Sequence, residues 1–165
     1  MSFQTIVRPA EPVDVADVRR VASAAWHTVY DDILGAETVD DLLSEGYATA
    51  VLERMIELDE IGLFVSTADG DVVGYASCGM TDAAGFGDLD LYVHPDYWGE
   101  GIGTDLLHRG ETHLRDLSVR KIRDEVLADN EVGNGFYRTH FEKIGERTTE
   151  VGGREYPVNV YERTV

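Results

Sequence analysis

A chain of 165 residues with an apolar fraction of 43 % fits one compact domain with one core, and this length suggests no second domain. Acidic residues outnumber basic ones 32 to 14, and the formal net charge of −18 disfavours binding to DNA or RNA phosphates. No apolar run approaches the ~20 residues that span a bilayer, and the first residues lack the basic and apolar regions of a signal peptide. We therefore expect one domain over residues 1–165, located in the cytoplasm, with neither a membrane nor a nucleic acid as partner.

The acidic residues are spread along the whole chain, so their surplus is a property of the surface and not of one segment. Lys121 and Lys143 are the only lysines. Self-repulsion of this kind destabilises a compact state unless salt screens it, and at molar salt the screening length is about 3 Å. An ordinary acidic protein is the alternative, but the scarcity of lysine favours adaptation to a salt-rich cytoplasm, as in a halophilic archaeon.

The N-terminal part of the chain predicts one strand followed by helices. Residues 3–8 are expected to form an edge strand that Pro9 stops. Apolar residues then recur every three or four positions from Val15 to Val29, which is one face of a helix, and Asp14 is its expected N-cap. A second helical region covers residues 38–58, and Gly46 is expected to break it in two.

Strands dominate the middle of the chain. Residues 61–68 and 71–80 are β-rich, and the turn Ala68-Asp-Gly-Asp71 between them is typical of a hairpin. After a loop at 81–87, residues 88–93 predict a strand and residues 101–117 an amphipathic helix.

The C-terminal part predicts a strand at 121–127, a short helix at 130–139, and two strands at 141–150 and 155–163 that flank a glycine pair. The resulting order is β-α-α-β-β-β-α-β-α-β-β. We therefore expect an α/β domain built on a mixed sheet with helices on its faces.

Three alternating glycines, Gly99, Gly101 and Gly103, connect a predicted strand to the first turn of a predicted helix. Glycines leave backbone N–H groups accessible, and the helix adds the positive end of its dipole, so the turn predicts a phosphate-binding site. A dinucleotide-binding fold fits badly, because it needs G-x-G-x-x-G directly after the first strand. A P-loop would need a Gly-Lys-Ser/Thr sequence, which the chain lacks.

A segment at residues 91–107 resembles the acyl-CoA-binding motif of the GNAT superfamily of N-acetyltransferases and reads Leu-Tyr-Val-His-Pro-Asp-Tyr-Trp-Gly-Glu-Gly-Ile-Gly-Thr-Asp-Leu-Leu. A second segment at residues 130–141 is similar to that family's Asn-x-x-Ala-x-x-Phe-Tyr-x-x-Gly-Phe and reads Asn-Glu-Val-Gly-Asn-Gly-Phe-Tyr-Arg-Thr-His-Phe. The resemblance implies a GNAT-like fold, in which helices flank a twisted and mostly antiparallel central sheet. It also implies transfer of an acetyl group from acetyl-CoA to a primary amine.

The chain departs from the family pattern at three positions. Trp98 stands where the family has Gln or Arg, Gly133 where it has Ala, and His140 where it has Gly. Backbone amides can bind a pyrophosphate without a polar side chain at position 98, so that departure leaves the expectation unchanged. The other two concern local turn geometry.

The resemblance implies roles for individual residues. The pantetheine arm would lie along the strand that ends at Val93, amides near 98–104 would hold the pyrophosphate, and Tyr137 would protonate the departing thiolate. A buried structural tyrosine and a simple N-cap are the alternatives for Tyr137 and Asn130. The residues implied to contact the co-substrate are Leu91, Tyr92, Val93, Trp98, Gly99, Glu100, Gly101, Ile102, Gly103, Thr104, Asn130 and Phe136.

An amine nucleophile has a pKa of roughly 10 and is mostly protonated at neutral pH, so the reaction needs a base. Asp88 and Asp90 are the carboxylates available on the strand beside the co-substrate, and their spacing puts both on one side unless a bulge intervenes. Asp88 is slightly preferred because the family often has an acidic residue near the beginning of this strand, whereas solvated carboxylates are the alternative. Tyr30 is a candidate contact for the acceptor, and Trp26 is expected in the core.

No metal site is predicted, because His108 and His113 lie five positions apart on a helix and do not share a face. Cys78, the single cysteine, excludes an internal disulfide, and its apolar strand argues against an acyl-cysteine route. Other acyl groups, an amino acid or protein N-terminus as acceptor, a catalytically silent acyl-CoA-binding module and a non-enzymatic dinucleotide-binding domain stay open as alternatives. The sequence leaves the oligomeric state open between monomer and homodimer.

Overall fold

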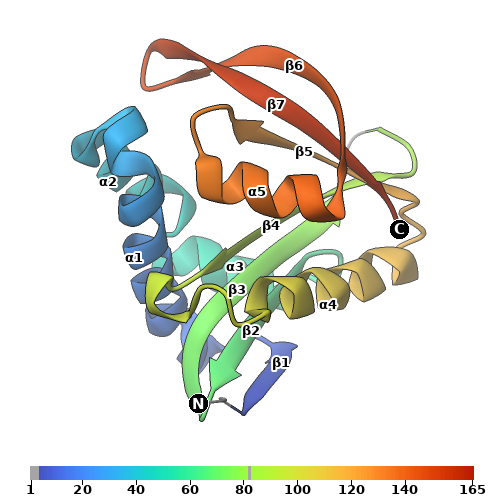
Figure 1. The fold of residues 1–165 in the computed structure, drawn as a ribbon. Helices are drawn as coiled ribbons and strands as arrows, with labels where there is room; N and C mark the ends of the chain where they lie inside the picture. Colours follow the sequence, from blue (N-terminus) through green and yellow to red (C-terminus); the bar gives the residue numbers. More distant parts are fainter. Residues whose placement is uncertain (1–3, 82) are drawn as a thin grey trace.

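The computed structural model describes residues 4–81 and 83–165 (Figure 1). Short 3-10 turns at Pro12–Asp14 and Pro95–Tyr97 precede α1 and α4. No helix in the described ranges is long and apolar enough to cross a bilayer. The strands and helices in chain order are β1 (Thr5–Pro9), α1 (Val15–Leu34), α2 (Ala36–Gly46), α3 (Thr49–Glu57), β2 (Gly62–Ala68), β3 (Asp71–Met80), β4 (Phe86–Val93), α4 (Ile102–Asp116), β5 (Lys121–Leu127), α5 (Glu131–His140), β6 (Glu142–Val151) and β7 (Arg154–Thr164).

All the strands join one sheet in the order β1-β2-β3-β4-β5-β7-β6, and every neighbouring pair is antiparallel except β4 and β5. Helices α4 and α5 cover one face, while α1 and α3 pack on the other (Figure 1). Successive side chains of a strand point to opposite faces, and Phe64 and Val65 of β2 accordingly belong to different buried clusters. The predicted mixed, mostly antiparallel sheet flanked by helices is confirmed.

The centre of the sheet is incompletely paired. Strand β4 has 8 residues, yet it pairs with β5 only through Phe86 with Lys121 and Gly87 with Ile122. On its other edge β4 pairs with β3 as far as Val93, and β5 pairs with β7 along its whole length. From Asp88 onward, therefore, β4 and β5 diverge, and one edge of β4 lacks a strand partner.

The predicted order of elements is confirmed, and their boundaries differ by only one or two residues except in α1, which continues to Leu34, five residues beyond the predicted apolar face that ends at Val29. The second helical region is broken as expected, because α2 ends at Gly46 and α3 begins at Thr49. The hairpin turn is confirmed as well: φ is 50° at Asp69 and 92° at Gly70, the left-handed backbone that an Asp-Gly turn favours. The predicted strand start at Phe3 and the loop residue Asp82 lie outside the described residues.

One local prediction is wrong in its chemistry. Asp14 is the N-cap of α1 by position, but its side chain makes no capping hydrogen bond to that helix. Its buried carboxylate instead accepts a 2.8 Å hydrogen bond from the Glu11 N–H and bonds of 2.7 and 3.0 Å from the Arg8 guanidinium. Arg8 thereby holds the pKa of Asp14 below its ordinary value. The Asp14 carboxylate, predicted to cap α1, thus binds Arg8 of β1 instead.

Helix α4 lies directly on β4, and a glycine allows this close approach. A Cβ at Gly110 would lie only 2.4 Å from Cδ1 of Leu89. Leu89 is 1 % exposed and enclosed by close-packed neighbours, so it has little room to move away. Gly110 therefore sets the distance between the helix and the central strand.

We expect Gly110→Ala to lower the free energy of unfolding by about 1–3 kcal/mol, because overpacking at Leu89 outweighs the better helix propensity of alanine. Gly135→Ala on α5 is the matched control, since its Cβ would meet nothing within 4 Å. The control should be stabilising by up to about 1 kcal/mol. Chemical denaturation at constant salt measures both, and equal effects would contradict close packing at Gly110.

Candidate active site

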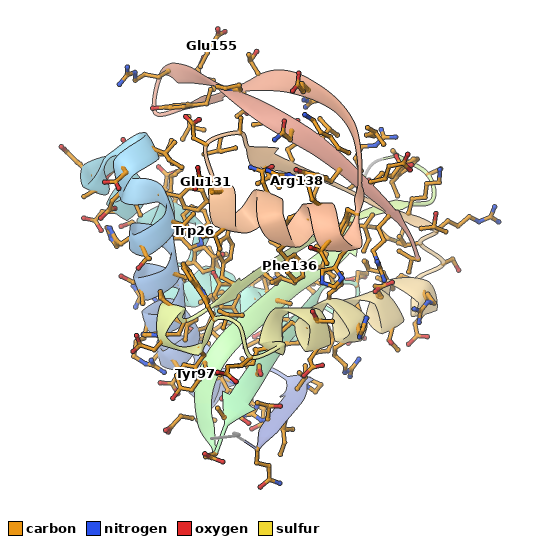
Figure 2. All side chains as sticks on the ribbon, in the orientation of Figure 1. Trp26, Tyr97, Glu131, Phe136, Arg138 and Glu155 are labelled. Carbon is orange, nitrogen blue, oxygen red and sulfur yellow. The ribbon has the colours of Figure 1, made fainter. Side chains whose placement is uncertain are left out.

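The divergence of β4 and β5 opens a cavity of about 370 Å³. Its walls come from α1, the end of β4, the connection from β4 to α4, the first turn of α4, and α5. Figure 2 shows Phe136 on the side of α5 that faces the start of α4, and Tyr97 in the connection. The cavity thus extends from the split in the sheet to the N-terminus of α4.

The glycine-rich turn lies at one end of this cavity. Gly99 and Gly101 have φ values of 81° and 80°, a left-handed conformation that strains other residues, and a Cβ at either would meet nothing within 4 Å. No side chain of the described chain caps the N-terminus of α4, so no capping oxygen occupies its first amides. An anion can therefore approach this turn without displacing a side chain.

Trp98 ties the glycine turn to the end of β4. Its indole Nε1 donates a 2.8 Å hydrogen bond to the carbonyl oxygen of Val93, the last residue of the strand. The indole N–H is therefore used inside the protein. Trp98 orders the turn and offers no polar group to a ligand from this position.

The open edge of β4 presents backbone groups to the cavity. Both backbone groups of Leu89 point to this edge, since its N–H donates to Asp124 and its carbonyl oxygen lies 3.1 Å from the Tyr137 hydroxyl. Alternate residues of a strand present backbone groups to the same edge. The backbone of Leu91 and the N–H of Val93 therefore face the cavity.

A buried carboxyl lies at the point where the two strands separate. Oδ1 of Asp124 on β5 accepts a 3.2 Å hydrogen bond from the Leu89 N–H, and its Oδ2 lies 3.0 Å from the Tyr137 hydroxyl oxygen. Burial, together with the negative charge of Asp90, raises the pKa of Asp124 well above its ordinary value. Burial and the neighbouring Asp124 raise the pKa of Tyr137 as well. The Asp124 side chain thus replaces the β5 backbone as partner of β4.

Aromatic side chains gather on the face of the sheet that α1 covers, opposite the face covered by α4 and α5. The hydroxyl oxygens of Tyr30 and Tyr92 are 2.9 Å apart, and the Tyr75 hydroxyl donates a 2.7 Å hydrogen bond to Tyr47. Trp26 contacts three of these rings and packs against the buried cluster of that face (Figure 2). This aromatic cluster joins α1 and the segment after α2 to strands β3 and β4.

Asp88 and Asp90 point to the same face as Tyr92, because β4 pairs with β3 without a bulge. Each is exposed at the protein surface. Desolvation by the surrounding protein nevertheless raises the pKa of Asp90 to about 6, and the charge of Asp88 adds to the rise. Asp90 also contributes, after burial, to the raised pKa of Tyr30 and of Tyr137. Of the two carboxylates, Asp90 is therefore the one whose charge acts on both Tyr30 and Tyr137.

Asn130 connects α5 to α1. Its Oδ1 caps α5 by accepting a 2.8 Å hydrogen bond from the Gly133 N–H, and its Nδ2 donates to the Tyr30 hydroxyl at 3.3 Å. A Cβ at position 133 would lie 2.4 Å from that Nδ2, so the glycine leaves room for the amide. Nε2 of His140 lies 3.2 Å from Oγ1 of Thr104 on α4. The two residues that differ from the family pattern, Gly133 and His140, thus lie where α5 contacts α1 and α4.

Most residues that the sequence implicates in acyl-CoA binding line this one cavity. Glu100 does not line it, and Asp88, Asp90 and Tyr30 lie beside it on the aromatic face. The implicated residues in its wall are Leu91, Tyr92, Val93, Trp98, Gly99, Gly101, Ile102, Gly103, Thr104, Asn130, Phe136 and Tyr137.

Sequence reasoning missed Asp124 and five lining positions, which are Ala25 and Val29 on α1, Tyr97, Val132 and Gly133. Asp124 stands between Ile122 and Val126 in the buried, alternating stripe of β5. A lone charged residue in such a stripe is the signal that could have identified it, since buried charges need partners. The two α1 positions look like ordinary core residues, so nothing chemical marks them.

In the described part of the chain, no group of three or more His, Cys, Asp and Glu side chains could hold a metal ion. Cys78 is buried, and burial raises the pKa of its thiol to about 12. The thiol is therefore protonated and unreactive at neutral pH.

A sequence model of the acetyltransferase (GNAT) family matches residues 26–141, from α1 to the end of α5. The chain belongs to this family. Among solved GNAT-like structures, the PaiA N-acetyltransferase of Thermoplasma acidophilum, in complex with coenzyme A, has a TM-score of 0.82, with 98 % of this chain and 99 % of that one covered, at 23 % identity. YncA of Salmonella typhimurium, solved with acetyl-CoA, has a TM-score of 0.66, with 97 % and 93 % covered, at 20 % identity. At these identities the likeness shows the shared fold.

A curated relative, the mycothiol acetyltransferase of Nocardiopsis dassonvillei, is 31 % identical over 116 residues, which are 64 % of this chain and 32 % of that protein. The chain thus spans about a third of the length of this relative. GNAT membership is established by the family match, and the acceptor is a separate question.

Proposed function

We propose that this GNAT protein is an N-acetyltransferase in which a primary amine directly attacks the acetyl group of acetyl-CoA. The observation that carries the proposal is a cavity that follows an open strand edge to an uncapped, glycine-rich helix N-terminus. Coenzyme A has an arm with two amides and a pyrophosphate, and these match a strand edge and a helix N-terminus respectively. The PaiA and YncA structures, which hold coenzyme A and acetyl-CoA, support this choice of ligand.

The chain's own backbone would supply most of the binding groups. The N–H and C=O of Leu91 and the N–H of Val93 would bind the pantetheine arm, while Tyr92 points its side chain to the aromatic face. Amides of residues 98–104, Glu100 among them, would bind the pyrophosphate. Phe136 and Asn130 would form the α5 side of the site.

Acetyl-CoA would supply a thioester whose acetyl carbon accepts an amine without a covalent enzyme intermediate. An N–H at Leu91 or Val93 would stabilise the negative charge that develops on the carbonyl oxygen. Tyr137 lines the cavity, its hydroxyl lies 3.1 Å from the Leu89 carbonyl oxygen on the same edge of β4, and it would protonate the sulfur as it leaves.

We assign the base to Asp90, although the sequence slightly favours Asp88. A carboxyl with a pKa of about 6 is ionised at neutral pH and basic enough to accept a proton from an amine in the transition state. Asp90 lies on the same face of β4 as Tyr92, whose ring contacts Tyr30 of α1, so the acceptor would enter from the side of α1. Carboxylates and aromatic rings attract a protonated amine, whether it belongs to a small molecule, an amino acid or a peptide.

Release of free thiol from acetyl-CoA in molar KCl, against polyamines, amino acids, aminoglycosides and N-terminal peptides, tests the function. We expect turnover with at least one of these amines, and Tyr137→Phe should lower kcat roughly 10- to 10⁴-fold if the tyrosine is the general acid. Tyr156→Phe on β7, outside the cavity, is the control and should leave kcat unchanged. Tight binding of coenzyme A without turnover on any amine would instead identify a catalytically silent module.

The pH dependence of the rate tests the base. Asp90 must be ionised to accept a proton, so kcat/KM should rise with pH through about 6 and then level off. Asp90→Asn should lower kcat/KM at neutral pH by roughly 10²-fold or more and remove this rise. Asp88→Asn should keep the rise but shift it to lower pH, because the charge of Asp88 raises the pKa of Asp90. The opposite pattern would assign the base to Asp88.

We also propose that the acidic surface is an adaptation to a salt-rich cytoplasm, because a net charge of −18 repels itself in dilute buffer. Raising KCl from 0.1 to 2 M shortens the screening length from about 10 Å to below about 3 Å. The Tm should therefore rise by about 5 °C or more, as measured by calorimetry. Sucrose at equal osmolality is the control, and a Tm that is unchanged in KCl would contradict the adaptation.

A further inference from the structure

Three polar groups form a closed ring where β4 leaves β5. The Leu89 nitrogen lies 3.2 Å from Oδ1 of Asp124, Oδ2 of Asp124 lies 3.0 Å from the Tyr137 hydroxyl oxygen, and that oxygen lies 3.1 Å from the Leu89 carbonyl oxygen. Leu89, Asp124 and Tyr137 are only 1 %, 6 % and 9 % exposed. The ring is therefore held by the protein and shielded from bulk water.

The number of hydrogens in the ring indicates the protonation state of Asp124. If Asp124 is ionised, one hydroxyl hydrogen of Tyr137 has to serve both the carboxylate and the Leu89 carbonyl. If Oδ2 carries a proton, that proton goes to the Tyr137 oxygen, the hydroxyl hydrogen goes to the Leu89 carbonyl, and every contact has its own hydrogen. The geometry therefore favours the neutral carboxyl.

The electrostatic surroundings agree with this state. The titratable groups that act on Asp124 are Tyr137 from α5, through a hydrogen bond, and the carboxylates Asp90 and Asp88 from β4, whose charges are negative. On β7, the Tyr161 hydroxyl is directed elsewhere, because it donates to Asn134 at 2.6 Å. Burial and these charges both disfavour a further carboxylate.

A neutral Asp124 would change what Tyr137 can do. A tyrosine that gave up its only proton would become a buried phenolate beside acidic groups, and burial already raises its pKa above its ordinary value. The ordinary pKa of a carboxyl is about 6 units below that of a phenol, so a carboxylate is the better place for the charge. A relay from the carboxyl through the hydroxyl avoids the phenolate.

We propose that Asp124 is a positioning residue that acts through Tyr137, and that it supplies the proton delivered to the departing sulfur. The step rests on the proposed acetyl transfer. The Tyr137 O–H bond breaks as the S–H bond of coenzyme A forms, and the Asp124 O–H bond breaks as a new Tyr137 O–H bond forms. The negative charge passes from the sulfur to Asp124, where the Leu89 N–H stabilises it, and solvent water restores the proton after product release.

Infrared spectroscopy of the ligand-free protein tests the protonation state without turnover. At pH 8 in KCl, wild type should show the carbonyl stretch of a protonated carboxyl, and Asp124→Asn should lack it. Asp90, whose pKa is about 6, is ionised under these conditions and does not contribute. A wild-type spectrum without a protonated carboxyl overturns the proposal, whatever the variant does.

Kinetics of matched variants test the proton relay. Asp124→Asn keeps an oxygen for the Leu89 N–H and an N–H for Tyr137 but cannot release a proton, so kcat should fall roughly 10- to 10³-fold. Its Tm, its KM for acetyl-CoA and its Kd for coenzyme A should stay close to wild type. Asp124→Leu, which loses both bonds, should also bind coenzyme A more weakly. In a Tyr137→Phe background, Asp124→Asn should cause no further loss of kcat, because the relay passes through Tyr137.

A wild-type kcat in Asp124→Asn overturns the relay, and so does weakened coenzyme A binding in that variant, since either result leaves Asp124 a purely structural role. The proposed function fails by a different result, which is the absence of turnover by wild type with every amine. The infrared result then still stands or fails independently.

Discussion

One hydrogen bond, from the Leu89 N–H to the side chain of Asp124, lets the central strands of this sheet separate. A buried N–H without a partner costs roughly 1–3 kcal/mol, and the β5 backbone does not supply that partner because its pairing with β4 ends at Gly87 and Ile122. The carboxyl reaches across the gap instead. The open edge of β4, the cavity and the position of Tyr137 all depend on that substitution of a side chain for a backbone.

Side chains and backbone groups alternate in direction along β4, and this alternation divides the proposed site into two sides. The backbone edge at Leu91 and Val93 belongs to the cavity, whereas Asp90 and Tyr92 project to the aromatic face beside α1. Acetyl-CoA along the strand edge and the amine acceptor on the aromatic face would therefore approach β4 from different directions. Holding two reactants in this way is a large part of what an enzyme contributes to such a transfer.

Local sequence was enough to predict the order of elements, the glycine turn and the Asn130–Tyr137 segment, because each depends on residues close together in the chain. The alternation along β5 marks Asp124 as a buried charge, but its role was missed because that role depends on where β5 leaves β4, which no local pattern records. The capping role of Asp14 was wrong for a similar reason: its partner Arg8 comes from another element. The hydrogen bond from the Trp98 indole to the Val93 carbonyl could likewise not be predicted from the residue type at position 98.

We propose that acyl-CoA binds in the split between β4 and β5, and a crystal structure of the protein with acetyl-CoA would test this placement. We expect the pantetheine arm to lie along the open edge of β4, with hydrogen bonds to the backbone of Leu91 and Val93, and the pyrophosphate to lie at the amides of residues 98–104. The hydrogen-bonded ring of Leu89, Asp124 and Tyr137 should be unchanged. Acetyl-CoA bound elsewhere, or β4 and β5 paired beyond Gly87 in the complex, would rule out this binding site.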